Sequence, residues 1–231
     1  MNRPIHSITE ILDAIAQGRN RTNLLRKYEQ RLIAFLVQYI PGWVSSNMLT
    51  ALGFMGNVLV SLSFILAALC DRYWFLLGAA GFAISWFGDS LDGRIAYYRK
   101  KPRKWYGFVL DLAVDWLGIV LIGFGFVLYA AGYLKVVGYA FITFYGLQII
   151  IALLKYKITG IYTIDAGILG PTEARIAVSL MMLIEIAFPG TLQYLAILAD
   201  LVLILSCYLE LKKTLRAADA RDREEQSIPH N

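Results

Sequence analysis

The chain has 231 residues, of which 58% are hydrophobic and 17% charged, and its mean hydropathy is +0.57. A soluble domain has about 45–50% apolar and about 25% charged residues, so the composition excludes that class and indicates a membrane protein. The net charge of +5 is carried by basic residues that flank apolar segments, which is typical of a membrane surface and not of nucleic-acid binding. The two cysteines, Cys70 and Cys207, both lie in apolar segments and imply no disulfide framework.

Residues 1–46 form a segment before the first long apolar stretch. It has no apolar core followed by a cleavage site, so we do not expect a removable signal peptide. Two interpretations are open: an amphipathic helix in the headgroup plane, with Tyr39 and Trp43 at the interface, or a soluble helix packed on the bundle. Both rest on apolar residues at helical spacing, namely Leu25, Tyr28, Leu32, Phe35 and Leu36.

Six apolar segments follow, and a helix needs about 20 apolar residues to cross a bilayer. They run over residues 47–70, 73–98, 105–131, 134–155, 173–188 and 191–211, the fifth being short. The sequence therefore predicts an all-α integral membrane protein, with six transmembrane helices in one domain of residues 47–212. We expect residues 213–231 to be a polar cytosolic tail, disordered from residue 217 onward.

Basic residues predict the orientation, because they gather on the cytoplasmic side of membrane proteins. One side would hold the basic N-terminal segment, the cluster of residues 94–104, and the basic end of the chain. The other side would hold only Arg72 and Lys135. We therefore expect both termini and the loop after the second segment to face the cytoplasm, in the inner membrane if the protein is bacterial.

Four aspartates lie where the second and third segments meet this loop. Asp89 and Asp92 are three residues apart, and Asp111 and Asp115 are four apart, so each pair lies on one helix face. The connection is short, which favours antiparallel neighbouring helices and brings the four carboxylates together.

Clustered carboxylates at this depth repel one another and resist desolvation, and a divalent cation would remove both penalties. Oxygen ligands without nearby histidine or cysteine favour Mg²⁺ or Mn²⁺ over Zn²⁺, and such ions commonly bind phosphate oxygens. Small residues on the same faces, Gly93, Ala96 and Gly107, leave room for a bulky ligand. The alternative, a set of interhelical hydrogen bonds, explains two adjacent pairs less well.

The stretch resembles the CDP-alcohol phosphotransferase family, whose signature is D-x2-D-G-x2-A-R-x8-G-x3-D-x3-D. Seven of the eight fixed residues are present, from Asp89-x2-Asp92-Gly93-x2-Ala96 to Gly107-x3-Asp111-x3-Asp115. The likeness extends loosely over the whole chain, including the "SSNMLT" stretch that enters the first segment.

Two positions depart from the signature. The spacer before Gly107 is one residue longer, which only lengthens a loop. The expected arginine is Tyr97, so one contact to the donor is in doubt. Arg94 should face away from the acids on a helix, which makes Arg99 the better substitute.

The resemblance implies transfer of a phosphatidyl-type group from a CDP-linked lipid to an alcohol, with release of CMP. Asp89, Asp92, Asp111 and Asp115 would hold two ions, and Asp115 would be the general base. Expected partners are the lipid donor, a small alcohol, the bilayer and a second copy of the chain. The donor contacts implied are Asn47, Thr50, Gly93, Ala96, Arg99 and Gly107. An alternative for the start of this helix is that Ser46 or Asn47 caps it.

Three cations would serve the acceptor. Lys155 and Lys157 follow the fourth segment and could equally be membrane anchors. Arg175 lies near the start of the fifth helix, where a cation is disfavoured by the helix dipole and suggests a bound anion. An acceptor that carries phosphate, such as glycerol phosphate or inositol phosphate, would fit this set.

Other functions stay open. A soluble CDP-aminoalcohol could be the donor and diacylglycerol the acceptor, or the acids could serve a divalent-cation transporter, although a pore should carry acids through its depth. Prenyl transfer is disfavoured because the chain lacks two separated Asp-rich helical repeats. Glu185 is expected near the interface, and Asp200, near mid-span, has no assigned role.

Overall fold

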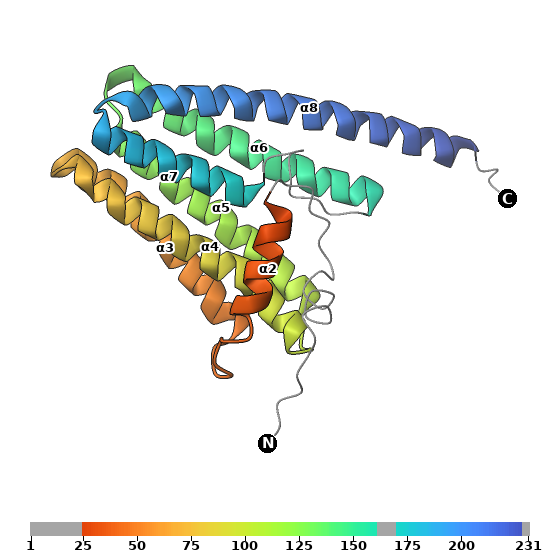
Figure 1. Ribbon diagram of the computed structural model, residues 1–231. Coiled ribbons are helices and arrows are strands. Elements are labelled where there is room, and N and C mark those ends of the chain that lie inside the picture. The colour runs from red at the N-terminus through yellow and green to blue at the C-terminus, as the bar shows by residue number, and fades with distance from the viewer. Residues whose placement is uncertain (1–24, 161–169, 228–231) are drawn as a thin grey trace.

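The computed structural model describes residues 25–160 and 170–227, and the regular structure of these residues is entirely helical. The long helices form a bundle in which neighbours along the chain are antiparallel (Figure 1). They are α2 (Arg26–Leu36), α3 (Ser46–Leu69), α4 (Phe75–Tyr98), α5 (Lys104–Tyr129), α6 (Lys135–Thr159), α7 (Pro171–Ala187) and α8 (Thr191–Ser227), with single 3₁₀ turns η1 (Arg72–Trp74) and η2 (Gly132–Leu134). Expectations for the residues before Leu25 lie outside the described part of the chain.

Five of these helices, α3, α4, α5, α6 and α8, are long and apolar enough to cross a membrane within the described residues. The prediction of an all-helical membrane protein is thus confirmed for five of the six expected spans. The exception is α7, whose 17 residues fall short of the about 20 that a bilayer core requires. It packs against α4 and α8 within the bundle, so its role as a sixth span stays a prediction.

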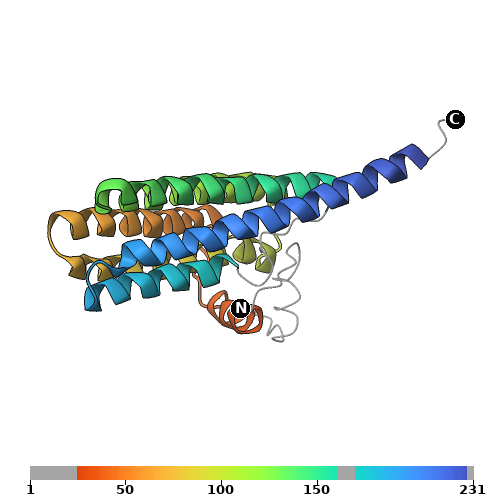
Figure 2. The same ribbon diagram turned by 90° about the horizontal axis from the view of Figure 1, so that it is seen from above.

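The C-terminal segment differs from expectation. Instead of ending near residue 212 and becoming disordered, α8 continues as one helix of 37 residues to Ser227 (Figure 2). Two ion pairs at helical spacing, Arg221–Glu225 and Arg223–Asp219, lie along this extension. Arg221 also donates hydrogen bonds to the carbonyl oxygens of Lys157 and Ile158, which ties the extension to the end of α6.

Helices α3 and α4 pack at unusually close range because glycines line their contact. A side chain on Gly56 would collide with the backbone of α4 at Gly81 and Ser85. A side chain on Gly88 would collide with the backbone of α3 at Leu49 and Gly53. Gly88 directly precedes Asp89, so this close packing sets the position of the first aspartate.

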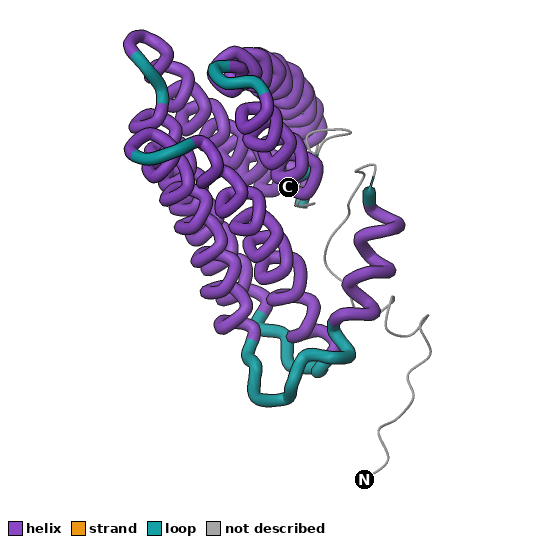
Figure 3. Tube along the Cα trace, turned by 60° about the vertical axis from the view of Figure 1, so that its left-hand side comes forward, coloured by secondary structure: helices purple, strands orange, loops and turns teal. Residues whose placement is uncertain are grey.

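Helix α2 lies across the bundle at the end that holds the aspartates (Figure 3). Its buried face, with Ile33, Ala34 and Val37, packs against apolar side chains of α3 and α4, and is not the face that the spacing of apolar residues predicted. The opposite surface, extended by the segment that follows α2, is exposed and largely aromatic; it consists of Tyr28, Leu32, Phe35, Tyr39 and Trp43. Contact of this face with the headgroups stays a prediction.

Glu185 lies near the end of α7 and is buried within the bundle, with 2% of its surface exposed. Its carboxylate accepts hydrogen bonds from the Tyr129 hydroxyl at 2.8 Å and from the backbone amides of Gly190 and Leu192 at 2.6 and 2.7 Å. It therefore joins α5 and α7 to the first turn of α8.

Candidate metal and substrate site

Three of the four predicted aspartates meet. Asp89 on α4 and Asp111 and Asp115 on α5 each place a carboxylate oxygen within 4.8 Å of the other two. All three are only partly buried, so water and ligands can reach them. Three converging carboxylates form an all-oxygen donor set, which fits Mg²⁺ or Mn²⁺. The antiparallel packing inferred from the short connection is what brings them together.

Asp92 stands apart from this group, so the expected convergence of all four acids is found for three. It is 4% exposed, and its Oδ2 accepts a hydrogen bond of 2.7 Å from the Thr50 hydroxyl. The other carboxylate oxygen accepts from the amide of Gly93, and its backbone carbonyl accepts from the Ser46 hydroxyl. Thr50 therefore orients Asp92 from α3, a role that the sequence did not reveal.

Arg175 reaches the acid cluster from the first turn of α7. Its guanidinium lies 2.7 Å from the Asp89 carboxylate, and both side chains are largely buried. The turn that carries it is anchored to α2, since Thr172 donates to Glu29 and the Leu25 amide donates to Glu173. The sequence placed Arg175 near the start of this helix, but it did not reveal the pairing of Arg175 with Asp89.

A polar cavity of about 270 Å³ opens beside Asp89, Asp92 and Asp111. The predicted donor residues Asn47, Thr50, Gly93, Ala96 and Gly107 all line it.

Two residues that the sequence did not suggest, Arg103 and Tyr106, also line this cavity. Arg103 donates a hydrogen bond of 2.6 Å to the side-chain oxygen of Asn47, and its guanidinium lies 4.1 Å from the ring centre of Tyr106. Tyr106 in turn accepts a hydrogen bond from the Asn47 amide. The basic run around Arg103 predicts orientation, and its place beside the motif is the sequence signal for this contact.

The arginines near Tyr97 are placed differently from expectation. Arg99 donates to the carbonyl oxygens of Ile40, Pro41 and Val44, in the connection between α2 and α3. These contacts hold that connection and give no support to a donor contact. Arg94, which we expected to face away, lines the polar cavity, although it is buried.

The lysines expected to serve the acceptor lie elsewhere. Lys155 pairs with Glu210 of α8 at 3.3 Å, and Lys157 is exposed. Of the three predicted acceptor cations, the structure brings only Arg175 to the acid cluster.

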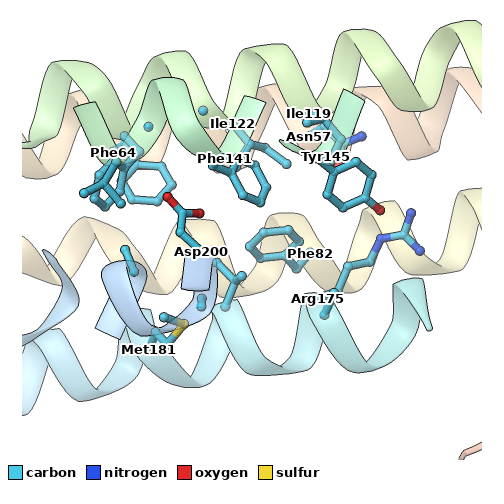
Figure 4. A pocket seen from close by; sticks show the side chains of 18 of the residues that line it. Asn57, Phe64, Phe82, Ile119, Ile122, Phe141, Tyr145, Arg175, Met181 and Asp200 are labelled. Atoms are coloured by element: carbon cyan, nitrogen blue, oxygen red, sulfur yellow. The ribbon is translucent and has the colours of Figure 1, made fainter. Parts of the chain in front are cut away.

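A second cavity, of about 130 Å³, lies on the other side of the cluster, and its walls are mostly apolar. Asp115 and Arg175 both line it, together with Tyr145. Figure 4 shows Arg175 and Tyr145 side by side at one end, with aromatic side chains beyond them. The acid cluster thus separates a polar cavity from an apolar one.

A helical bundle with an all-carboxylate cluster beside a polar cavity could hold a metal ion and suits phosphate chemistry. Residues 43–209 match the model of the CDP-alcohol phosphatidyltransferase family, and the chain belongs to this family. Membership implies a membrane transferase of phospholipid synthesis that acts on a CDP-alcohol, in a family that generally depends on divalent cations. No curated protein matches the chain.

Proposed function

We propose that the protein transfers a phosphatidyl-type group from CDP-diacylglycerol to an alcohol and releases CMP. The observation that carries the proposal is the cluster of Asp89, Asp111 and Asp115, whose carboxylate oxygens lie within 4.8 Å of one another. A polar cavity lies on one side of the cluster, and an apolar cavity that Asp115 lines lies on the other.

The acid residues would hold two Mg²⁺ or Mn²⁺ ions, with Asp92 as the fourth ligand. Bound ions would supply charge neutralisation to the pyrophosphate of the donor. To bind an ion, Asp92 could give up the hydrogen bond that its Oδ2 accepts from Thr50. Alternatively, it could keep that hydrogen bond and bind the ion through its other carboxylate oxygen. The oxygen-only donor set supports these ions over Zn²⁺.

The nucleotide of the donor would occupy the polar cavity. Gly93, Ala96 and Gly107 leave space there, and a side chain added at Gly107 would meet nothing within 4 Å. Arg103, already held by Asn47 and Tyr106, would supply the cation that the signature places at Tyr97. Phosphate groups bind arginine through charge-assisted hydrogen bonds, which is why this position suits the donor.

In the reaction, Asp115 would accept the proton of the acceptor hydroxyl. The acceptor oxygen would then form a bond to the phosphorus nearer the lipid, and the bond from that phosphorus to the oxygen of CMP would break. The position of Asp115 supports this role, because it is the one motif aspartate that lines the second cavity. Arg175, beside Asp89, would hold a phosphate or hydroxyl oxygen of the acceptor.

One observation favours a second candidate. The cavity at Asp115 is largely apolar, and only one of the predicted acceptor cations reaches it. This favours a lipid alcohol such as diacylglycerol as the acceptor, with a soluble CDP-aminoalcohol as the donor.

A matrix of donors and acceptors tests both candidates. Purified protein in vesicles would receive CDP-diacylglycerol with glycerol phosphate or inositol phosphate, or a CDP-aminoalcohol with diacylglycerol, each with Mg²⁺ or Mn²⁺. CMP release in one row, abolished by Asp115→Asn and kept by Asp219→Asn on the exposed part of α8, supports the corresponding reaction. Absence of CMP release in every row contradicts the proposed function.

A further inference from the structure

Asp200, on α8, is a buried acid that the proposed reaction does not use. It is 7% exposed, and its Oδ2 has no hydrogen-bond partner among the described residues. A buried polar atom without a partner costs about 1–3 kcal/mol, and native proteins rarely retain one. Some group other than the described residues is therefore expected to donate to this oxygen.

The surroundings of Asp200 restrict what that group can be. Its carboxyl group points into the apolar cavity, among Phe64, Ile122 and Phe141 (Figure 4). Arg175 is the one cation among the lining residues and lies toward the opposite end. An anionic ligand would be repelled at Asp200, and a purely apolar one would leave the oxygen unpartnered.

Water alone is a poor occupant of this end of the cavity. A buried water ordinarily makes about three hydrogen bonds to protein groups. Near Asp200 the neighbouring walls are aromatic and aliphatic, so a water would find few partners beyond the carboxyl group. The cavity volume of about 130 Å³ is also far larger than the roughly 10–15 Å³ that one water needs.

We propose that this cavity is a binding site for a mainly apolar alcohol or amine, whose hydroxyl or amino group donates to Asp200. The apolar walls would cover the body of such a molecule, and the carboxyl group would fix the position of its polar end. The cavity also reaches Asp115 and Arg175, so its occupant would lie next to the candidate active site. The proposal concerns binding and stands whether or not the transfer reaction is correct.

Two matched photolabelling probes test it: an eight-carbon alcohol that carries a diazirine on its chain, and the same chain without the hydroxyl. Each would be added to the full-length protein in vesicles, and the labelled residues would be located by mass spectrometry. We expect the alcohol to label cavity residues such as Met181 at about tenfold lower concentration than the alkane, the effect of one hydrogen bond to a buried acceptor.

Variants assign the preference to Asp200. Asp200→Leu should label equally with both probes, and Asp200→Asn, which keeps an acceptor oxygen, should retain part of the preference. Ala196→Phe, which places a large side chain in the cavity, should reduce labelling by both probes. Leu198→Phe, on the exposed side of the same helix, should change neither.

Equal labelling of the wild type by the two probes would overturn the proposal, as would absence of labelling in the cavity. An alcohol preference that persists in Asp200→Leu would also overturn it. Should Asp200→Leu fail to fold, the wild-type comparison and competition between unlabelled octanol and octane decide the question. None of these measurements depends on CMP release. Failure of the proposed binding site is therefore distinguishable from failure of the proposed function.

Discussion

The guanidinium of Arg175 and the carboxylate of Asp89 lie 2.7 Å apart and connect α7 to the acid cluster between α4 and α5. The pair places one positive charge beside three partly buried carboxylates. Bound divalent ions would compete with Arg175 for Asp89. The arginine would then be released toward the cavity that Asp115 lines, where an acceptor oxygen could take its hydrogen bonds.

Replacing Arg175 should therefore lower the free energy of unfolding most when metal is absent. We expect Arg175→Gln to lower the free energy of unfolding of the metal-free protein by about 3 kcal/mol, because breaking a buried ion pair leaves an uncompensated charge. Added Mg²⁺ should reduce the difference in the free energy of unfolding between wild type and variant, since the ion would neutralise Asp89. Unfolding in detergent with and without Mg²⁺ measures both. Arg223→Gln, in an exposed pair on α8, is the control and should change little.

Removing one carboxylate of the cluster should weaken metal binding. Asp89→Asn, Asp111→Asn and Asp115→Asn should each reduce Mn²⁺ affinity about tenfold or more, because a neutral amide replaces a charged ligand. Titration followed by electron paramagnetic resonance of Mn²⁺ gives the affinity. Asp219→Asn should leave it unchanged, and undiminished binding in all three cluster variants would show that these residues hold no ion.

Two motif-region glycines should respond differently to a methyl group. Gly88→Ala should separate α3 from α4, since the added carbon would collide with the backbone of Leu49 and Gly53. We expect destabilisation by about 1–3 kcal/mol and loss of activity. Gly107→Ala meets nothing within 4 Å, so the variant should fold like the wild type but bind the donor less well. Unfolding curves and the KM for the donor separate the two effects; equal stability of both variants would contradict the packing argument.

Replacement of two nearby arginines, Arg103 and Arg99, should have different effects. Arg103→Ala should raise the KM for the donor about tenfold, consistent with loss of one charge-assisted hydrogen bond, while leaving stability nearly unchanged. Arg99→Ala should instead destabilise the connection between α2 and α3, because three carbonyl oxygens lose their donor. Introducing the signature arginine with Tyr97→Arg should partly restore donor binding in Arg103→Ala. A normal KM in Arg103→Ala would remove this residue from the donor site.

Glu185 should be a stability residue and not a catalytic one. Glu185→Ala leaves the amides of Gly190 and Leu192 without their acceptor, and we expect a loss of about 3 kcal/mol in the free energy of unfolding. Tyr129→Phe removes only one hydrogen bond and should cost about 1 kcal/mol. Thermal unfolding measures both, and Glu225→Ala on the exposed extension of α8 is the control.

The sequence predicted the parts of the site that depend on local spacing. Asp111 and Asp115 share a face because they are four residues apart, and the short connection to Asp89 made α4 and α5 neighbours. Asp92 escaped this reasoning, because Thr50 on another helix decides where its carboxylate points. The pairing of Arg175 with Asp89, 86 residues apart in sequence, likewise depends on how α7 packs in three dimensions.

The same distinction explains the acceptor residues. Lys155 was assigned to the acceptor from charge and position, but Glu210 on α8 takes its ammonium group. Glu210 lies 55 residues away in the sequence, and no local sequence pattern predicts the contact. The length of α8 was also underestimated, since polar composition suggested disorder where pairs four residues apart support a helix.

The unbroken course of α8 has a mechanical consequence. A helix of 37 residues is about 55 Å long, whereas the apolar layer of a bilayer measures about 30 Å. Roughly 25 Å of helix would therefore project beyond the lipid, held part-way along its length by the hydrogen bonds of Arg221 to the end of α6. Whatever is attached to its tip, whether a label, a fused reporter or a binding partner, would be carried at a set height above the membrane instead of drifting on a tether.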